Sequence, residues 1–257
     1  MIDVHSHIVF GVDDGSRTIE ESIEIIKEAY KAGFKKIVAT PHYMEEYYEN
    51  DAKEIRKRIV EIQNHLKEIN CNIEILQGNE IYIADNMTEL LENQKATTLN
   101  NQQYVLFELP LNAEVMNLNS VVYQILEIGG VPILAHPERY PFVQKDPNVL
   151  IPLIEKGVLM QSNYGSIIGQ YRKAAQITIK KMLEHNMVHF LGSDVHRPQT
   201  IYPKIHECME EIEKIVGKEN LELITTINPN KAINGEKIEI DEPIPINESF
   251  LKKLFHK

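Results

Sequence analysis

Apolar residues recur with a helical period in several segments of the chain. The first four that share one helical face are Ile19, Ile23, Ile26 and Tyr30. Thr18 and Glu21 form a capping box at the start of this segment, and Gly33 is a typical helix-ending residue. Further helices are predicted near residues 55–69, 118–128, 148–156, 171–186, 203–216 and 219–226.

Short apolar runs between these helices are typical of buried parallel strands. They cover residues 2–4, 36–39, 73–76, 104–107, 131–135, 158–160 and 189–191. Most of them are separated by a predicted helix, and this alternation favours parallel βα units. The pattern therefore predicts an α/β barrel of about seven units, with an open doubly wound sheet as the alternative architecture.

Histidines and carboxylates follow nearly every predicted strand, at the end where a βα barrel collects its active-site groups. In chain order they are His5, His7, His42, Glu80, Glu108, His136, Asp194 and His196. The sixth strand ends near Gln161 and Asn163 and lacks such a residue. Imidazole and carboxylate groups without a thiolate suit catalytic Zn, Mn or Fe, and these are too many ligands for one ion.

A single histidine near a strand is more often an ordinary polar residue than a metal ligand. The joint pattern differs, because five of the ten histidines lie just past predicted strands. His189 opens the last strand, at the opposite end of the barrel, and is expected to be structural. The segment Asp13-Asp14-Gly15 is equally typical of a turn and of a ligand-bearing loop.

Composition narrows the classes of function. The 257 residues carry a net charge of -11, which disfavours a nucleic-acid partner. The two cysteines, Cys71 and Cys208, give neither a disulfide framework nor a thiolate zinc site. The chain starts without a signal-peptide pattern and contains no long apolar run, so we expect a cytoplasmic protein with no direct membrane insertion. We predict one catalytic barrel over residues 1–242, followed by a C-terminal tail over 243–257.

Several motifs resemble those of the PHP (polymerase and histidinol phosphatase) superfamily. Within it, the chain is similar to the bacterial metal-dependent protein tyrosine phosphatases of capsule and exopolysaccharide operons. The resemblance covers nearly the whole chain. It rests on Met1-Ile-Asp-Val-His-Ser-His7, Gly11-Val-Asp-Asp-Gly15, Ala39-Thr-Pro-His42, Gly78-Asn-Glu-Ile81, Ala135-His-Pro-Glu-Arg139 and Gly192-Ser-Asp-Val-His196.

The resemblance implies a distorted (β/α)7 barrel that holds three divalent metal ions, manganese first, with iron or zinc as alternatives. It implies one metal site formed by His5, His7, Glu80 and Asp194. A second would use Glu80, Glu108 and His136, and a third would use Asp14, His42 and His196. Asp14 thereby becomes an expected ligand, whereas Asp13 does not.

Catalysis by such a centre needs no protein nucleophile, because divalent metals activate water directly. Arg139 matches its family motif and is expected to bind the phosphate, with Arg197 as a second candidate and His196 as a candidate acid. Thiol-based tyrosine phosphatases place an arginine six residues after the cysteine. Here Gln77 and Lys214 occupy those positions, so a cysteine mechanism is disfavoured.

The expected substrate, implied by the resemblance, is the phosphotyrosine tail of a cognate bacterial tyrosine kinase. Histidinol phosphate or another small phosphomonoester is the alternative within the same chemistry. A nuclease module and a non-catalytic kinase-binding assembly factor are alternatives of other classes. Members of the family can form rings, so a homo-oligomer is among the expected assemblies.

Overall fold

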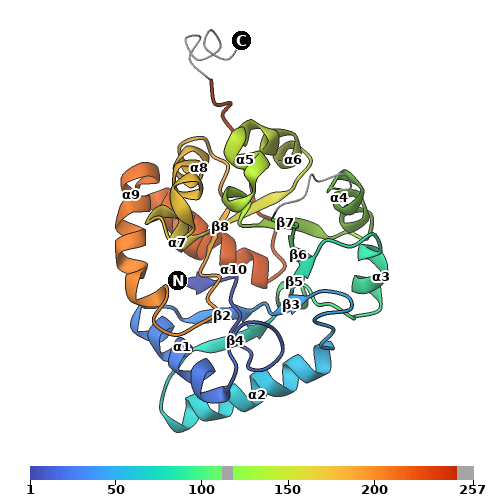
Figure 1. Cartoon of the computed structure of the whole chain (residues 1–257), viewed down its shortest axis with the longest axis vertical. Coiled ribbons are helices and arrows are strands. Elements are labelled where there is room, and N and C mark those ends of the chain that lie inside the picture. The colour runs from blue at the N-terminus through green and yellow to red at the C-terminus, as the bar shows by residue number, and fades with distance from the viewer. Residues whose placement is uncertain (112–117, 248–257) are drawn as a thin grey trace.

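A curled parallel sheet forms the centre of the protein in the computed structural model, which describes residues 1–111 and 118–247 (Figure 1). Its strands form two hydrogen-bonded groups, ordered β1-β2-β4 and β3-β5-β6-β7-β8-β9, with every pairing parallel. The strands are β1 (Ile2–Asp3), β2 (Lys36–Ala39), β3 (His42–Tyr43), β4 (Glu74–Gln77), β5 (Glu80–Tyr82), β6 (Tyr104–Glu108), β7 (Val131–Ala135), β8 (Leu159–Asn163) and β9 (Phe190–Gly192).

The nine strands correspond to the seven predicted ones, because two of these are interrupted. Pro41, which has no backbone N–H to donate, separates β2 from β3. Gly78 lies between β4 and β5, where a Cβ atom would meet side chains of Leu99 and Val38 at 3.1 and 3.2 Å. A parallel bridge between Ser6 and Val195 joins the first strand segment to the last. The predicted distorted (β/α)7 barrel is confirmed, and the open sheet is not.

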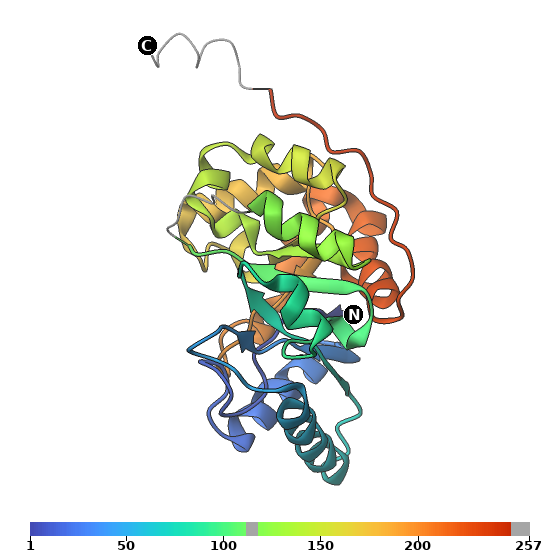
Figure 2. The same ribbon diagram turned by 90° about the vertical axis from the view of Figure 1, so that its right-hand side faces the viewer.

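Helices cover the outside of the sheet (Figures 1 and 2). The longer ones are α1 (Ile19–Lys31), α2 (Ala52–Glu68), α4 (Leu118–Glu127), α8 (Arg172–Glu184) and α9 (Ile205–Glu222). The shorter ones are α3 (Met87–Glu92), α5 (Pro141–Lys145), α6 (Ile151–Glu155), α7 (Tyr164–Ile167) and α10 (Asn228–Ile233). Gly217, with φ 77° and ψ 167°, interrupts the range of α9, and a π-helical turn at Leu223–Ile227 continues its second part into α10. The two helices predicted near residues 203–216 and 219–226 therefore lie on either side of Gly217. No helix among the described residues is both long and apolar enough to cross a bilayer.

Helix α1 begins and ends as predicted, but its buried face differs from the prediction. The Thr18 side chain caps the first turn by accepting a hydrogen bond from the Glu21 N–H. Tyr30, which was placed on the buried face, is 37% exposed. The buried positions are Ser22, Ile25, Ile26 and Ala29. Ser22 on this face lies close to the loop before the helix, where its hydroxyl is 2.9 Å from that of Ser16.

Successive residues of each strand point to opposite faces of the sheet. Their apolar side chains therefore belong alternately to two separate clusters. In β6, Tyr104 and Leu106 pack with Ile133, Leu159 and Phe190 from the neighbouring strands. The other face of the sheet packs against the surrounding helices. Helix α10 adds apolar side chains to the first cluster and contacts β1. The barrel interior is therefore a packed core, which leaves the loops after the strands to form the site.

The predicted C-terminal tail lies partly within the described chain. The N–H of Ile244 donates to the His185 carbonyl, 2.9 Å away, and Ile246 exchanges hydrogen bonds with Asn148. This stretch therefore packs back on the ends of α8 and the segment before α6. The apolar residues from Phe250 onward lie outside the described residues. The division into a barrel over 1–242 and a tail over 243–257 stays a prediction.

Candidate metal centre

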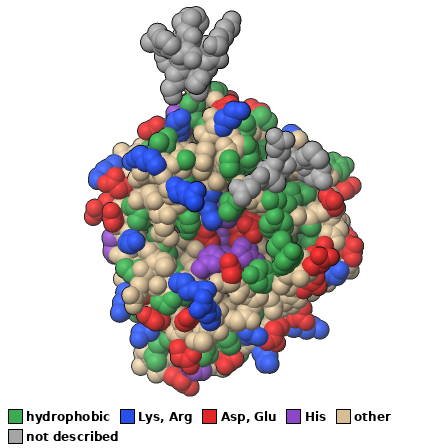
Figure 3. Space-filling view, viewed as in Figure 1, with side chains coloured by type: hydrophobic (Ala, Val, Ile, Leu, Met, Phe, Trp, Pro, Cys, Tyr) green, Lys and Arg blue, Asp and Glu red, His purple; other side chains and the backbone are tan. Residues whose placement is uncertain are grey.

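All the ligands predicted from the strand ends meet at one place on the barrel. Figure 3 shows the histidine side chains gathered in the middle of one face, beside acidic side chains, with Lys and Arg side chains nearby. The loops after β1 and β9, strands β3 and β5, and the ends of β6 and β7 carry these residues. Asp14, from the turn after β1, joins the same cluster, although it follows no strand directly.

Glu80 lies at the centre of the cluster and is fully buried. Its Oε2 lies 3.2 Å from His5 Nε2, 3.3 Å from His7 Nε2 and 3.1 Å from His42 Nδ1. Its other oxygen, Oε1, lies 2.9 Å from His136 Nε2. One carboxylate thus faces four imidazoles that come from three different segments of the chain.

The remaining ligands lie on either side of Glu80. The Oδ1 atom of Asp14 is 3.5 Å from His42 Nε2 and 3.4 Å from His196 Nε2. On the other side, Glu108 Oε1 is 3.0 Å from His42 Nδ1, and its Oε2 is 3.8 Å from His136 Nε2. The third predicted ligand set is therefore brought together, and His42 faces both it and the second set.

Asp194 completes the grouping around His5 and His7. Its Oδ1 lies 3.6 Å from His5 Nε2 and 3.5 Å from His7 Nε2. Ligand atoms close enough to hold an ion together occur in three combinations: His5, His7 and Glu80; His42, Glu80 and Glu108; and His7, Asp14, His42 and His196. These overlap with the sets implied by the sequence, but the first lacks Asp194, the second has His42 in place of His136, and the third also includes His7.

Hydrogen bonds from outside the cluster determine which ring nitrogen faces it. The carboxylate of Asp13 lies 2.7 Å from His7 Nδ1, which leaves His7 Nε2 to face Glu80. In the same way, His196 Nδ1 lies 3.0 Å from the backbone carbonyl of Asp194, so its Nε2 faces Asp14. A carboxylate or carbonyl that holds the far nitrogen is the usual support of a metal-bound histidine.

The cluster carries an excess of negative charge. Five carboxylates meet there, those of Asp13, Asp14, Glu80, Glu108 and Asp194. Among the described residues, Arg139 is the one lysine or arginine that forms an ion pair with any of them. Although burial lowers the pKa of His5, the carboxylates of Glu80 and Asp194 raise it overall to about 9. Burial likewise lowers the pKa of His42, but Glu80 and Glu108 raise it to about 12. This environment attracts cations strongly.

A divalent metal fits the residues that are present. The buried atoms Glu80 Oε2 and His42 Nδ1 approach each other closely, yet neither has a hydrogen-bond partner among the described residues. Two buried polar atoms that approach each other without a hydrogen bond suit a shared cation. The donors are imidazole nitrogens and carboxylate oxygens, the ligand types that Zn, Mn and Fe accept.

Unusual backbone conformations position two of these ligands. His136 has φ 35° and Asp194 has φ 51°, both in the left-handed region, which costs about 1–3 kcal/mol for a residue other than glycine. Two glycines allow the chain to come close to the site. A Cβ atom at Gly15 would lie 2.3 Å from the His7 carbonyl oxygen, and one at Gly192 would lie 2.7 Å from His5 Cβ.

Both predicted phosphate-binding arginines lie beside the cluster. The Nη1 atom of Arg139 donates to Asp194 Oδ2 over 2.7 Å, and its guanidinium lies over the ring of Tyr171 at 4.6 Å. The guanidinium of Arg197 donates instead to the backbone carbonyls of Gly15 and His196. Arg139 is therefore hydrogen-bonded to the side chain of a predicted ligand, whereas Arg197 is hydrogen-bonded to the backbone.

Sequence reasoning missed several supporting residues. Gln161 and Asn163, from the strand without predicted ligands, bond His5 and Asp194. Tyr48 stacks on His42, with ring centroids 5.9 Å apart. Amides and tyrosines are common throughout the chain, so their residue types alone carry no signal. The position of Gln161 and Asn163 at a strand end was the one clue that could have found them.

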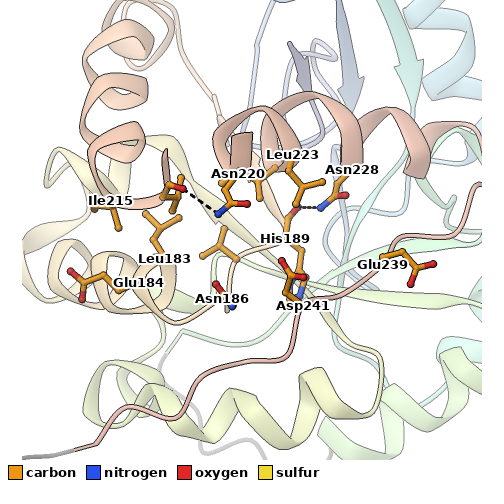
Figure 4. A pocket seen from close by; sticks show the side chains of 13 residues that line it. Leu183, Glu184, Asn186, His189, Ile215, Asn220, Leu223, Asn228, Glu239 and Asp241 are labelled. Carbon is orange, nitrogen blue, oxygen red and sulfur yellow. Dashed lines mark hydrogen bonds between the residues drawn. The ribbon is translucent and has the colours of Figure 1, made fainter. Parts of the chain in front are cut away.

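His189 lies at the opposite end of the sheet, as predicted, and its role there is structural. Its Nδ1 accepts a hydrogen bond from the Met160 N–H over 3.0 Å, and the carbonyl of His189 accepts one from Asn228 Nδ2. The residue lines a cavity of about 160 Å³ between the ends of α8 and α9 and the segment near Asp241 (Figure 4). This cavity is separate from the histidine–carboxylate cluster.

The barrel and the histidine–carboxylate cluster at its strand ends define a PHP-type barrel with candidate metal-binding groups. The family model for capsular polysaccharide synthesis, CpsB/CapC, matches residues 1–234, and the chain belongs to this family. The family resemblance predicted from the sequence is therefore confirmed.

Several characterised proteins are similar to this chain over most of its length. Tyrosine-protein phosphatase YwqE of Bacillus subtilis (strain 168) is 30% identical over 255 residues, which are 99% of each chain. Tyrosine-protein phosphatase CpsB of Streptococcus pneumoniae is 30% identical over 243 residues, 93% of this chain and all of that one. A crystal structure from work on these two metal-dependent tyrosine phosphatases matches with a TM-score of 0.91 and 29% identity, covering 96% of this chain and 100% of the other. A structure of histidinol phosphate phosphatase from Lactococcus lactis subsp. lactis Il1403 shares the fold, with a TM-score of 0.53 and 14% identity. The match covers 83% of this chain and 93% of that one.

Proposed function

We propose that this protein is a metal-dependent protein tyrosine phosphatase that hydrolyses phosphotyrosine to tyrosine and phosphate. The observation that carries the proposal is the convergence of the predicted ligands. Seven of the nine form candidate metal-binding groups, and His136 and Asp194 contact Glu80 and His5 within the same cluster. The names of the relatives support both the metal dependence and the tyrosine specificity.

Three divalent ions, manganese first and iron or zinc as alternatives, would occupy the cluster. The short distances from Glu80 to His5, His7 and His42 support a shared central carboxylate. Asp194 would complete the first site. Glu108 and His136 would belong to the second, and Asp14, His42 and His196 to the third.

Bound divalent ions would supply an activated water and hold the phosphoryl oxygens. The chain itself would orient the substrate. Arg139, whose side chain is 22% exposed at the edge of the cluster, can turn from Asp194 to donate charge-assisted hydrogen bonds to phosphate. Arg197, bound to two carbonyls, would help to hold the loops. The hydrogen bond from His196 Nδ1 to a carbonyl leaves a lone pair on Nε2, which favours a ligand over an acid catalyst.

The cysteines do not support a thiol mechanism. Both are buried, and burial raises the pKa of each thiol, to about 12 for Cys208. A thiolate nucleophile would therefore be scarce at neutral pH. Neither thiol belongs to the histidine–carboxylate cluster.

The proposed physiological substrate is the phosphotyrosine tail of a cognate bacterial tyrosine kinase in capsule or exopolysaccharide synthesis. The description of the family as capsular polysaccharide synthesis supports this. A cytoplasmic location and a homo-oligomeric assembly stay predictions from the sequence. Histidinol phosphate remains the second candidate substrate, since the same barrel occurs in a histidinol phosphate phosphatase.

Phosphate release tests the proposal. A phosphotyrosine peptide, a phosphoserine peptide and histidinol phosphate should be compared with Mn and with EDTA. We expect Mn-dependent hydrolysis that is fastest on phosphotyrosine and is abolished by EDTA but not by iodoacetamide. Faster hydrolysis of histidinol phosphate would overturn the substrate. Inactivation by iodoacetamide with no effect of EDTA would overturn the mechanism, and no hydrolysis at all would favour a non-catalytic assembly factor.

A further inference from the structure

Strand β8 contributes amides where the other strands contribute ligands. Gln161, Ser162 and Asn163 end this strand, and none of the three has any exposed surface. A buried amide that lacks hydrogen bonds is costly, so such groups are nearly always paired. The partners of Gln161 and Asn163 are two predicted ligands of the first metal site.

The network around Gln161 determines the direction of its amide. Its Nε2 donates to the Ser162 carbonyl over 2.9 Å and to Asn163 Oδ1 over 3.0 Å. Its Oε1 is therefore the atom that lies 2.6 Å from His5 Nδ1. A flipped amide would turn its oxygen toward two other acceptors.

This direction selects one tautomer of His5. Since Gln161 Oε1 can only accept, His5 Nδ1 must carry the proton. In the neutral ring the other nitrogen, Nε2, then has a free lone pair, and this atom faces Glu80 Oε2 at 3.2 Å and Asp194 Oδ1 at 3.6 Å. Gln161 thus prepares the atom that a metal would bind.

Asn163 extends the same network to Asp194. Its Oδ1 accepts from Gln161, so its Nδ2 is the donor to Asp194 Oδ2 over 2.7 Å. Arg139 donates to the same oxygen. Asp194 Oδ1 is left to face His5 and His7. The neighbouring strand makes room for this network, because a Cβ atom at Gly192 would lie 2.7 Å from Gln161 Nε2.

We propose that Gln161 and Asn163 are positioning residues that present His5 Nε2 and Asp194 Oδ1 to the first metal site. The inference rests on the proposed metal centre, but not on the identity of the substrate. The two amides act through His5 and Asp194 and need not touch the metal or the phosphate. Outer partners of this kind typically change metal affinity by about 10–100-fold.

Gln161→Met separates positioning from packing. Methionine fills a similar volume but cannot accept the hydrogen bond from His5 Nδ1–H. Long-range ¹H–¹⁵N NMR of the metal-free protein above about pH 9, where the His5 ring is neutral, would report its tautomer, and calorimetry would report Mn affinity. We expect a single tautomer with Nδ1 protonated in the wild type. Gln161→Met should give mixed tautomers and roughly tenfold weaker Mn binding.

Asn163→Leu and a matched control complete the test. Asn163→Leu should keep the His5 tautomer but weaken Mn binding about tenfold, because Asp194 loses a donor. Ser162→Ala is the control, since Ser162 is equally buried on the same strand and its Oγ has no partner among the described residues. It should change neither readout.

Unchanged tautomer and affinity in Gln161→Met would overturn the proposal, as would an equal loss of affinity in Ser162→Ala. Both readouts are made without substrate. A protein that passes them but does not hydrolyse phosphotyrosine would refute the proposed function alone.

Discussion

Both ends of the barrel bury a histidine, but the pKa is raised at one end and lowered at the other. His5, at the carboxyl ends of the strands, has a pKa that burial lowers but Glu80 and Asp194 raise overall to about 9. His189, at the amino ends, has a pKa that burial lowers to about 4. Neither ring is more than 5% exposed.

This contrast shows that burial alone does not mark a functional histidine. His189 is a neutral ring that accepts one backbone hydrogen bond and supports the strand beside it. His5 belongs to a group of rings that share carboxylates and face one another, with His5 Nε2 only 3.2 Å from His7 Nε2. Two nitrogens at that distance need either a shared proton or a common metal ion.

The largest expected effect comes from removing the central carboxylate. Glu80→Gln keeps the shape of the side chain but removes the charge that faces His5, His7 and His42. Bound Mn and phosphotyrosine hydrolysis should both fall by more than about a hundredfold, since losing even an outer partner costs ~10–100-fold. Elemental analysis and phosphate release would measure this. His189→Ala should keep both, and full activity in Glu80→Gln would contradict the proposed centre.

A smaller effect is expected from Arg139→Lys. Lysine keeps the positive charge near Asp194 but cannot form two parallel hydrogen bonds to phosphate. We expect kcat/KM to fall roughly tenfold to a hundredfold, the value of one or two charge-assisted hydrogen bonds, while the Mn content is unchanged. Steady-state kinetics at saturating Mn would check this. Loss of Mn from the variant would instead assign Arg139 to holding Asp194.

The pH dependence of stability should separate the two ends of the barrel. The pKa of His5 rises from 6.5 to about 9 on folding, so its contribution is fully present below pH 6.5 and is lost as the pH rises to 9. The metal-free protein should therefore lose thermal stability across that window, and Mn should restore it at the high end. Calorimetry at several pH values would measure the change in Tm.

The control for this measurement is His189→Ala, whose metal-free form should show the same fall in Tm. The pKa of His189, about 4, lies below the window. A Tm that stays constant from pH 6.5 to 9 would contradict the electrostatic account of the cluster.

The smallest effect concerns His189 itself. His189→Ala leaves the buried N–H of Met160 without its acceptor. The free energy of unfolding should fall by about 1–3 kcal/mol, with little change in kcat/KM or Mn content. Urea denaturation would measure the loss. A large drop in activity with unchanged stability would give His189 a role in catalysis that the structure does not indicate.

Much of the fold and of the site could be predicted because parallel strands all end at one edge. That rule brought together residues as distant in sequence as His5 and Asp194. Periodicity was less reliable for Tyr30, since adjacent Ile25 and Ile26 allow a helix to bury either of two overlapping faces. The breaks at Pro41 and Gly78 depend on tertiary contacts. The roles of Gln161, Asn163 and Asp13 depend on hydrogen-bond direction, which residue types do not reveal.

The most direct test of the metal centre is anomalous X-ray diffraction from a crystal of this protein loaded with Mn. The account predicts three anomalous peaks at the strand ends, among the nine ligands from His5 to His196, and none beside His189. An empty cluster at saturating Mn, or a peak only in the cavity near His189, would contradict it.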